Sequence, residues 1–496
     1  MNSWTIFLRR LSTSVSSSSS IRHPSLKRSP LYSTLTDKDV TFFEKLLPKR
    51  IVTDYDDCLP YNVDWIKTCH GQSKLVLRPK TVQEISDILR YCNERKLAVC
   101  PQGGNTGLSG GSVPVFDEIV LSLSLLNRIH DFNQNSAVLT TESGCVLQTL
   151  EKYVEQFGHT IPLDLGAKGS CHIGGNVATN AGGLRVVRYG PLRANILGLE
   201  IVLADGTILD CLTQLRKDNT GYDLKQHFIG SEGTLGIITQ VSILCPPKMS
   251  SVGLGFFSCE TFEDVLKVLR LARHKLGETL SAIEFMDNTS LKLSMRYLKK
   301  DSGPIKESPF YVIIETMSTS SEHCKNMMEL FSTKALEDGC ITDGTLAQDL
   351  NQYSELWALR ESISNGLVSD GYVFKYDFSL GLKHMYELVE ITRKLMEPLK
   401  DVRNVTGFGH VGDGNLHLNV TTKEYSQTVK DVLEPFLYEW VSKQRGSISA
   451  EHGLGLHKAK YLGLGKSLHA LDIMRNIKTL FDPNLILNPY KLFPYK

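Results

Sequence analysis

The sequence has no long uninterrupted hydrophobic run, so it predicts no membrane-spanning helix. No stretch of the 496-residue chain approaches the roughly 18 to 20 apolar residues that a spanning helix needs. Lys plus Arg number 55 and Asp plus Glu number 54, so the formal net charge is only +1. Without an excess of one sign, no global field favours nucleic acid or an anionic membrane surface. We therefore expect neither nucleic acid nor a membrane surface as a partner. Any anion that the protein binds must be held by a specific pocket.

The eleven cysteines include no C-x-x-C pair and show no regular spacing, and their number is odd. This pattern argues against a disulfide framework and favours a reducing compartment, with buried structural thiols as the expected state. The chain is also longer than the roughly 250 to 300 residues at which single cores stop growing. We therefore expect two or three domains.

Residues 1–36 lack Asp and Glu, although they carry five Lys or Arg residues and a serine run at 16–20. Several apolar residues fall roughly on one face of a potential helix: Trp4, Phe7, Leu8, Leu11 and Val15. A basic, serine-rich, acid-free amphipathic start is typical of a mitochondrial transit peptide. We predict that residues 1–36 direct the protein to the mitochondrial matrix; a merely disordered tail is the alternative.

Residues 101–111 form the first of three glycine-rich segments. A strand is predicted at 74–79, a helix from Thr81 with Glu84 completing a capping box, and a second strand at 97–100. A doubly wound dinucleotide fold needs a helix directly after its glycines. Here the chain continues to another strand-like stretch at 118–123, so we reject that fold.

The other two glycine-rich segments are residues 166–183 and 230–238. Bare backbone amides in such loops bind anionic phosphates, and glycine lets a flat ring approach the main chain closely. Flexible turns are the alternative for any one loop. Three such loops together predict a large ligand that carries both phosphates and a ring.

Pro246 and Pro247 mark a predicted domain boundary. Beyond it, strands alternate with helices, and the strands are not the continuous apolar runs of a buried parallel sheet. This pattern favours an antiparallel sheet with helices on one face. The predicted strands are 253–257, 310–315 and 372–378, and the helices are 263–272, 322–331 and 382–399. From Ser426 onward the chain is predicted to be mostly helical.

His410 and His417 flank a Gly-Asp-Gly-Asn stretch, and Glu451 and His452 follow later. Asp-Gly and Gly-Asn favour tight turns, so two extended segments should fold back and bring both imidazoles together. Two imidazoles and one carboxylate are the ligand set of a catalytic zinc site with an open position. We predict His410, His417 and Glu451 as zinc ligands, which leaves His452 free as a general base.

The glycine-rich loops, residues 230–236 (GSEGTLG) and the terminal 488–491 (NPYK) together resemble the vanillyl-alcohol-oxidase-like FAD flavoproteins. Residues 410–417 and the pair Glu451-His452 resemble the branch that acts on D-2-hydroxy acids. The resemblance extends over roughly residues 40–496. It implies an α+β fold with an FAD-binding domain at 45–248, a cap-like substrate domain at 249–420, and a C-terminal helical segment at 421–496 that completes the active site.

The same resemblance implies which residues hold FAD. The pyrophosphate would lie on the first loop and the flavin on the second and third: Gly103, Gly104, Asn105, Thr106 and Gly107, then Pro162, Gly166, Ser170, Gly174, Gly175, Asn176 and Ile238. Some members of the wider family tether FAD through a histidine in the first loop, but this chain has Asn105 there. We expect noncovalent FAD, with His172 as the residue that challenges this prediction.

The resemblance further implies oxidation of D-2-hydroxyglutarate to 2-oxoglutarate, with electron-transfer flavoprotein as the electron acceptor and a homodimer as one candidate assembly. Zinc would activate the substrate hydroxyl, and His452 would take its proton. The residues that would bind the substrate are Arg360, Ser364, Lys375, Asn419 and His452, with Ser364 standing where the family often has Thr.

Two alternatives accompany this prediction. One is a D-lactate dehydrogenase of the same fold. Its substrate has a single carboxylate, so the second of the two cations, Lys375 beside Arg360, would have no carboxylate to bind. A zinc-dependent hydrolase, or a metal-binding protein without flavin, would use the glycine loops only as turns. A plain ion pair with Glu355 or Glu361 is the alternative for Arg360 itself.

Overall fold

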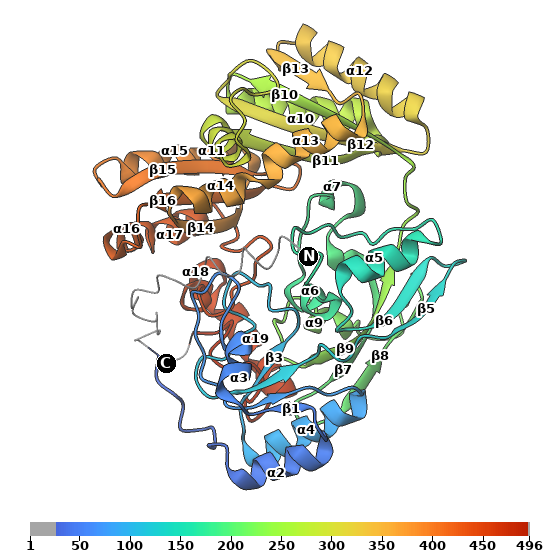
Figure 1. Ribbon diagram of the computed structural model, residues 1–496, viewed down its shortest axis with the longest axis vertical. Helices are drawn as coiled ribbons and strands as arrows, with labels where there is room; N and C mark the ends of the chain where they lie inside the picture. Colours follow the sequence, from blue (N-terminus) through green and yellow to red (C-terminus); the bar gives the residue numbers. More distant parts are fainter. Residues whose placement is uncertain (1–25, 495–496) are drawn as a thin grey trace, which may run out of the picture.

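The computed structural model describes residues 26–494, so the first 25 residues of the predicted transit peptide lie outside the described residues. Figure 1 shows two smaller sheets in its lower part and one large sheet with its helices in the upper part. This arrangement is the predicted α+β architecture.

The chain begins with a four-stranded sheet of order β1-β2-β4-β3, in which β2 and β3 both run parallel to β4. Helix α4 packs on it, because Ile85, Ile88, Leu89 and Cys92 recur at helical spacing and are all buried. Thr81 caps this helix by accepting the Glu84 N–H, as predicted. The elements are α2 (Asp37–Leu46), β1 (Ile51–Val52), α3 (Tyr55–Asn62), β2 (Val76–Leu77), α4 (Val82–Arg95), β3 (Val99–Gln102) and β4 (Ile119–Ser122).

A five-stranded antiparallel sheet of order β5-β6-β9-β7-β8 follows. The second and third glycine-rich segments lie beside it, in the loops around α6 and before β9. Its elements are β5 (Ile129–Asn133), β6 (Val138–Glu142), α5 (Leu147–Glu155), α6 (Ile173–Thr179), α7 (Val186–Tyr189), α8 (Leu192–Asn195), β7 (Ile196–Val202), β8 (Ile208–Cys211), α9 (Lys225–Phe228) and β9 (Ile237–Leu244).

The large sheet has the order β13-β10-β12-β11-β15-β16-β14, and every pairing in it is antiparallel, as predicted. Its elements are β10 (Ser251–Cys259), α10 (Phe262–Leu276), β11 (Leu280–Asp287), α11 (Asn288–Leu298), β12 (Phe310–Ser318), α12 (Ser321–Glu337), β13 (Asp343–Leu346), α13 (Leu350–Glu361), α14 (Ile363–Asp370), β14 (Tyr372–Ser379), α15 (Met385–Met396), β15 (Val402–His410) and β16 (Asn415–Thr422).

The prediction that helices cover one face of this sheet is wrong. Phe257 packs with α10, α12 and α15, whereas its neighbour Phe256 packs with α11, α13 and α14. Because successive strand residues point to opposite faces, the two helix groups cover opposite faces. The periodicity of a helix shows that it has a buried side, but it does not show which face of a sheet that side meets.

The C-terminal segment connects the two parts of the molecule. It contains α16 (Gln427–Leu433), α17 (Phe436–Lys443), α18 (Leu462–Gly465) and α19 (Leu468–Phe481). Helices α16 and α17 pack in the core of the large sheet, while Phe481 of α19 packs against the core of the five-stranded sheet. Between them, the chain passes through residues 447–457, which reach the predicted metal site.

Ten of the eleven cysteines are buried and Cys211 is partly buried, which agrees with the prediction of buried thiols. Within residues 26–494 we find no helix with the length and apolar character that crossing a membrane would require.

Candidate active site

The glycine-rich segments line one cleft. Nine of the twelve predicted cofactor-binding residues face it, while Pro162, Gly166 and Ser170 do not. Those facing the cleft are Gly103, Gly104, Asn105, Thr106, Gly107, Gly174, Gly175, Asn176 and Ile238. His172 also lines the cleft.

Glycine is required where the first two loops touch. A Cβ on Gly104 would lie 2.0 Å from the Ser170 carbonyl oxygen, so no larger residue fits without separating the loops. In the same cleft, Nδ1 of His172 and Oδ1 of Asn176 are buried, and no residue in the range 26–494 forms a hydrogen bond with either atom. Buried polar groups are normally paired, so these atoms indicate a site built for a polar ligand.

Two predicted metal ligands, His410 and His417, share one face of the large sheet with the predicted substrate ligands Lys375 and Asn419. The hairpin β15–β16 forms as predicted, with Gly414 in its turn at φ +82°. Residues two apart on a strand project from the same face. Asp377 pairs with His417 and Lys375 pairs with Asn419, so alternate positions of β14 and β16 deliver all four side chains together.

The structure brings His410, His417 and Glu451 together. The two Nε2 atoms are 3.3 Å apart, and they lie 3.9 and 3.6 Å from the nearest Glu451 carboxylate oxygens. Asp377, His417, Glu451 and His452 form an overlapping cluster with metal-binding spacing. However, Asp377 Oδ2 accepts three backbone N–H groups, so we regard it as a structural group and not a ligand.

The environment sets the ionisation of these groups. Burial favours neutral His410, but the Glu284 carboxylate outweighs burial and raises the pKa of His410 to about 9. Burial lowers the pKa of His417 to about 3. Burial opposes ionisation of Glu451, but a hydrogen bond from His452 and the two nearby imidazoles lower the pKa of Glu451 to about 2. The carboxylate is therefore charged and available to a cation.

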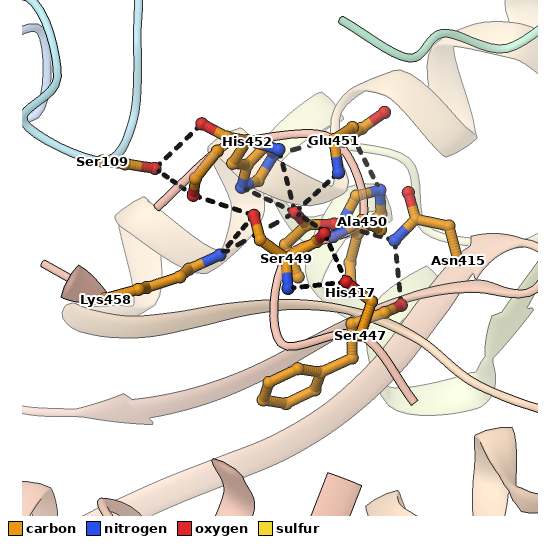
Figure 2. Close-up of polar contacts among 12 residues, drawn as sticks. Ser109, Asn415, His417, Ser447, Ser449, Ala450, Glu451, His452 and Lys458 are labelled. Atoms are coloured by element: carbon orange, nitrogen blue, oxygen red, sulfur yellow. Dashed lines mark hydrogen bonds and ion pairs between the residues drawn. The ribbon is translucent and has the colours of Figure 1, made fainter. Parts of the chain in front are cut away.

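The loop that carries Glu451 and His452 is fixed from both parts of the molecule. From the large sheet, Asp377 binds its backbone N–H groups. From the third glycine-rich segment, Glu232 accepts the N–H groups of Leu454 and Gly455 at 2.8 and 2.7 Å, while holding a left-handed φ of +55°. Figure 2 shows Ser109, from the first loop, donating to the carbonyls of His452 and Gly453.

A second cavity, of about 830 Å³, opens beside this loop. Lys375 and Ser364 line it, as the substrate prediction requires, and His452 lines both this cavity and the glycine-lined cleft. Burial lowers the pKa of Lys375, and no described side chain or carbonyl pairs with its ammonium group. A cationic side chain therefore faces an open space next to His452.

Arg360 and Asn419 are placed differently from Lys375. Arg360 lines neither cavity: its Nε and Nη2 bind Glu284 at 2.9 and 2.7 Å, and its guanidinium lies 4.7 Å from the centre of the Phe408 ring. Asn419 is buried and donates to the His417 carbonyl oxygen at 3.3 Å. Both lie next to the histidine pair and away from the cavity walls.

Sequence reasoning missed three carboxylates that organise the site: Asp377, Glu232 and Glu284. Asp377 could have been found from strand alternation, because it lies two residues after Lys375. Glu232 stands inside the GSEGTLG segment but was interpreted only as part of a ligand loop. Glu284 had one weak signal, an acid inside the otherwise apolar stretch 282–286.

Comparison with known proteins agrees with this geometry. Residues 73–212 match the FAD binding domain family, and residues 248–492 match the C-terminal domain of FAD linked oxidases. The solved structure of p-cresol methylhydroxylase with substrate bound superposes with a TM-score of 0.73 at 14% identity, covering 93% of this chain and 98% of that one. The fold is thus that of the vanillyl-alcohol-oxidase-like flavoproteins.

The similarity in sequence is more specific. Mitochondrial D-2-hydroxyglutarate dehydrogenase of Bos taurus is 55% identical over 95% of this chain and 86% of its own length. A putative mitochondrial D-lactate dehydrogenase of Schizosaccharomyces pombe is 49% identical over 95% of this chain and 92% of its own length. The chain belongs to the D-2-hydroxyglutarate dehydrogenase family of FAD-linked oxidases.

Proposed function

We propose that this protein oxidises D-2-hydroxyglutarate to 2-oxoglutarate, with noncovalent FAD in the glycine-lined cleft and a zinc ion on His410, His417 and Glu451. The observation that carries the proposal is the position of His452. It lines both the cleft and the 830 Å³ cavity and lies beside the three candidate ligands. A base at that position faces the cofactor space on one side and the substrate space on the other.

The donor set fits zinc. Bonds of about 2.1 Å at tetrahedral angles place neighbouring ligand atoms about 3.4 Å apart, and the separations here are 3.3, 3.6 and 3.9 Å. Three protein ligands leave one position open. Nδ1 of His410 lies 2.6 Å from Glu284, which turns Nε2 toward the other ligands. When bound, zinc would lower the pKa of the substrate hydroxyl as it does that of water.

His452 would take the hydroxyl proton. Its Nε2 lies 3.5 Å from Glu451, and its Nδ1 lies 3.8 Å from Asp377. Burial opposes the imidazolium form, but the Asp377 and Glu451 carboxylates together outweigh burial and raise the pKa of His452. Asp377 therefore stabilises the cation that forms when His452 accepts a proton. FAD would supply the hydride acceptor, whose redox chemistry belongs to the cofactor.

The substrate carboxylates would be held by Lys375, Ser364, Arg360 and Asn419. Lys375 offers a compact charge to the carboxylate farther from the histidines. Arg360 has two of its nitrogens on Glu284, and among the described residues none pairs with its Nη1, which leaves one donor for substrate. Asn419 would hydrogen-bond the carboxylate nearest the histidines.

D-lactate oxidation on the same fold is the second candidate, since one relative carries that name. The unpaired ammonium of Lys375 favours a dicarboxylate, because a monocarboxylate would leave this cation without a partner. From the relatives' names and the acid-free start of the chain we further propose a mitochondrial matrix location. Electron-transfer flavoprotein as acceptor and a homodimer remain predictions.

The decisive experiment assays D- and L-2-hydroxy acids with an artificial electron acceptor, with and without a chelator. We expect a yellow protein that releases its flavin on denaturation, prefers D-2-hydroxyglutarate over D-lactate, and loses activity with the chelator while retaining the flavin. A colourless protein contradicts the flavin assignment. Full activity in metal-free protein contradicts the zinc assignment, and flavin that stays on the denatured chain points to a covalent link at His172.

A further inference from the structure

We propose that Glu284 is a positioning residue that couples zinc binding at His410 to substrate binding at Arg360. The inference rests on the proposed function and adds to it a residue on β11 that lies outside the predicted ligand sets. It explains why a fully buried carboxylate stands between a candidate metal ligand and a candidate substrate ligand.

The register of the sheet creates this contact. Phe285 pairs with Gly409, which places their neighbours Glu284 and His410 opposite each other on β11 and β15. Oε1 of Glu284 lies 2.6 Å from Nδ1 of His410, and Oε2 lies 2.7 Å from Nη2 of Arg360. Glu284 is completely buried, so both of its partners are fixed by protein and not by solvent.

Each contact restricts one partner. When His410 binds a metal through Nε2, its other nitrogen, Nδ1, keeps a proton that Glu284 holds, and Nε2 is the atom that faces His417 and Glu451. On the other side, Glu284 holds Nε and Nη2 of Arg360 and fixes the plane of the guanidinium. The orientation of the remaining nitrogen, Nη1, is thereby set.

A second contact path runs between the same groups. The Arg360 guanidinium lies over the Phe408 ring, and the centre of that ring is 5.2 Å from the centre of the His417 imidazole. Arg360 is thus connected to His410 through a carboxylate and to His417 through an aromatic ring. If a substrate carboxylate displaced Arg360, the positions of both candidate zinc ligands would change.

The alternative is that Glu284 only neutralises two buried cations. Glu315 provides a matched control, because it is also a fully buried carboxylate on a strand of the same sheet. Its partners are an arginine, Arg185, and a tyrosine, Tyr353. Neither Arg185 nor Tyr353 touches the histidine pair. Loss of charge at Glu315 therefore tests burial and folding without altering the zinc ligands.

The experiment measures zinc affinity of the FAD-loaded protein by chelator competition in the absence of substrate, then KM and kcat at saturating zinc. In E284Q we expect zinc affinity to fall about 10- to 100-fold, the usual effect of losing a carboxylate behind a ligating histidine. At saturating zinc we expect KM for D-2-hydroxyglutarate to rise several-fold with a smaller change in kcat. E315Q should keep the zinc affinity of the parent.

Arg360→Lys tests the coupling from the other end, and it also serves if E284Q does not accumulate as flavin-loaded protein. Arg360 touches no zinc ligand, yet its replacement should weaken zinc binding by about twofold or more, as expected within one hydrogen-bonded network. Unchanged zinc affinity in E284Q, or in Arg360→Lys if E284Q does not fold, overturns the inference. A parent protein that binds no zinc refutes the proposed function instead.

Discussion

Oδ2 of Asp377 accepts the backbone N–H of His452 at 2.9 Å, and the same oxygen accepts those of Glu451 and Ala450 at 3.0 and 3.1 Å. One buried carboxylate therefore fixes the main chain that carries both a candidate zinc ligand and the candidate base. Asn415 holds the other oxygen at 2.8 Å, so the carboxylate itself cannot rotate. On this side the position of the loop depends on β14, as on the other side it depends on Glu232.

Asp377→Asn should lower kcat about 100-fold, because a displacement of about 1 Å in the reacting groups can have that effect. The amide keeps the size of the side chain but removes the charge that three N–H donors share. FAD content should stay at the level of the parent, since Asp377 does not line the glycine-lined cleft. Steady-state kinetics and the flavin absorbance check both expectations.

Asp370→Asn is the matched control for that substitution. Asp370 is also a buried carboxylate next to β14, but it binds Asn404 and Thr421 at the opposite end of the strand. We expect kcat close to that of the parent. Equal losses in the two variants would mean that Asp377 acts only on folding.

His452→Gln should lower turnover by about 10²- to 10⁴-fold, the usual contribution of a general base. Glutamine preserves polarity and approximate size but cannot accept the hydroxyl proton. Zinc and FAD should both remain, because three other side chains form the candidate zinc site. Metal analysis and rapid-reaction kinetics of flavin reduction measure these quantities, and His384→Gln at the protein surface serves as the control. Parental rates of flavin reduction would exclude His452 as the base.

Lys375→Met should raise KM for D-2-hydroxyglutarate by about 10- to 100-fold, as expected for loss of a hydrogen bond between charged groups. Methionine retains most of the apolar length of the side chain and removes only the ammonium group. Activity on D-lactate should not fall, because a monocarboxylate has no second anion for this cation. A parallel loss on both substrates would show that Lys375 does not contact the distal carboxylate.

The parts of the site that were predictable are those determined by neighbouring residues. The hairpin that joins His410 to His417 follows from its Gly-Asp-Gly-Asn turn, and strand alternation places Lys375 beside Asp377. Likewise, helix α4 follows from its cap and apolar spacing. Each of these features is encoded within about ten residues, where periodicity and turn preferences act.

The partners of these residues were not predictable, because they come from distant segments. Arg360 was predicted to bind substrate, with an ion pair to Glu355 or Glu361 as the alternative, but its partner is Glu284, 76 residues earlier in the chain. Glu232 meets Leu454 across 222 residues. Such pairs depend on strand order and on how the two parts of the molecule pack, and local sequence patterns contain neither.

The start of the chain gives the last prediction. Residues 26–36 were expected to belong to a removable presequence, yet Arg28 forms a 2.6 Å ion pair with Asp117, and the hydroxyl of the buried Tyr32 donates to the Leu485 carbonyl. Thr36 also caps α2. A chain that begins at residue 37 should therefore unfold at a lower temperature than one that begins at 26, by about 2 °C or more.

The unfolding temperatures of the two truncated proteins, both loaded with FAD, are measured to test this. Tyr32→Ala in the longer protein measures how much one buried side chain contributes to that temperature. Tyr32 packs edge to face on Tyr490, within the terminal NPYK segment, so its loss should also loosen the C-terminal end of the chain. If all three proteins unfold at the same temperature, residues 26–36 add nothing to stability and the presequence can extend to residue 36. If the shorter protein is less stable, cleavage before Arg28 is the expected maturation step, because only then does the mature chain keep these contacts.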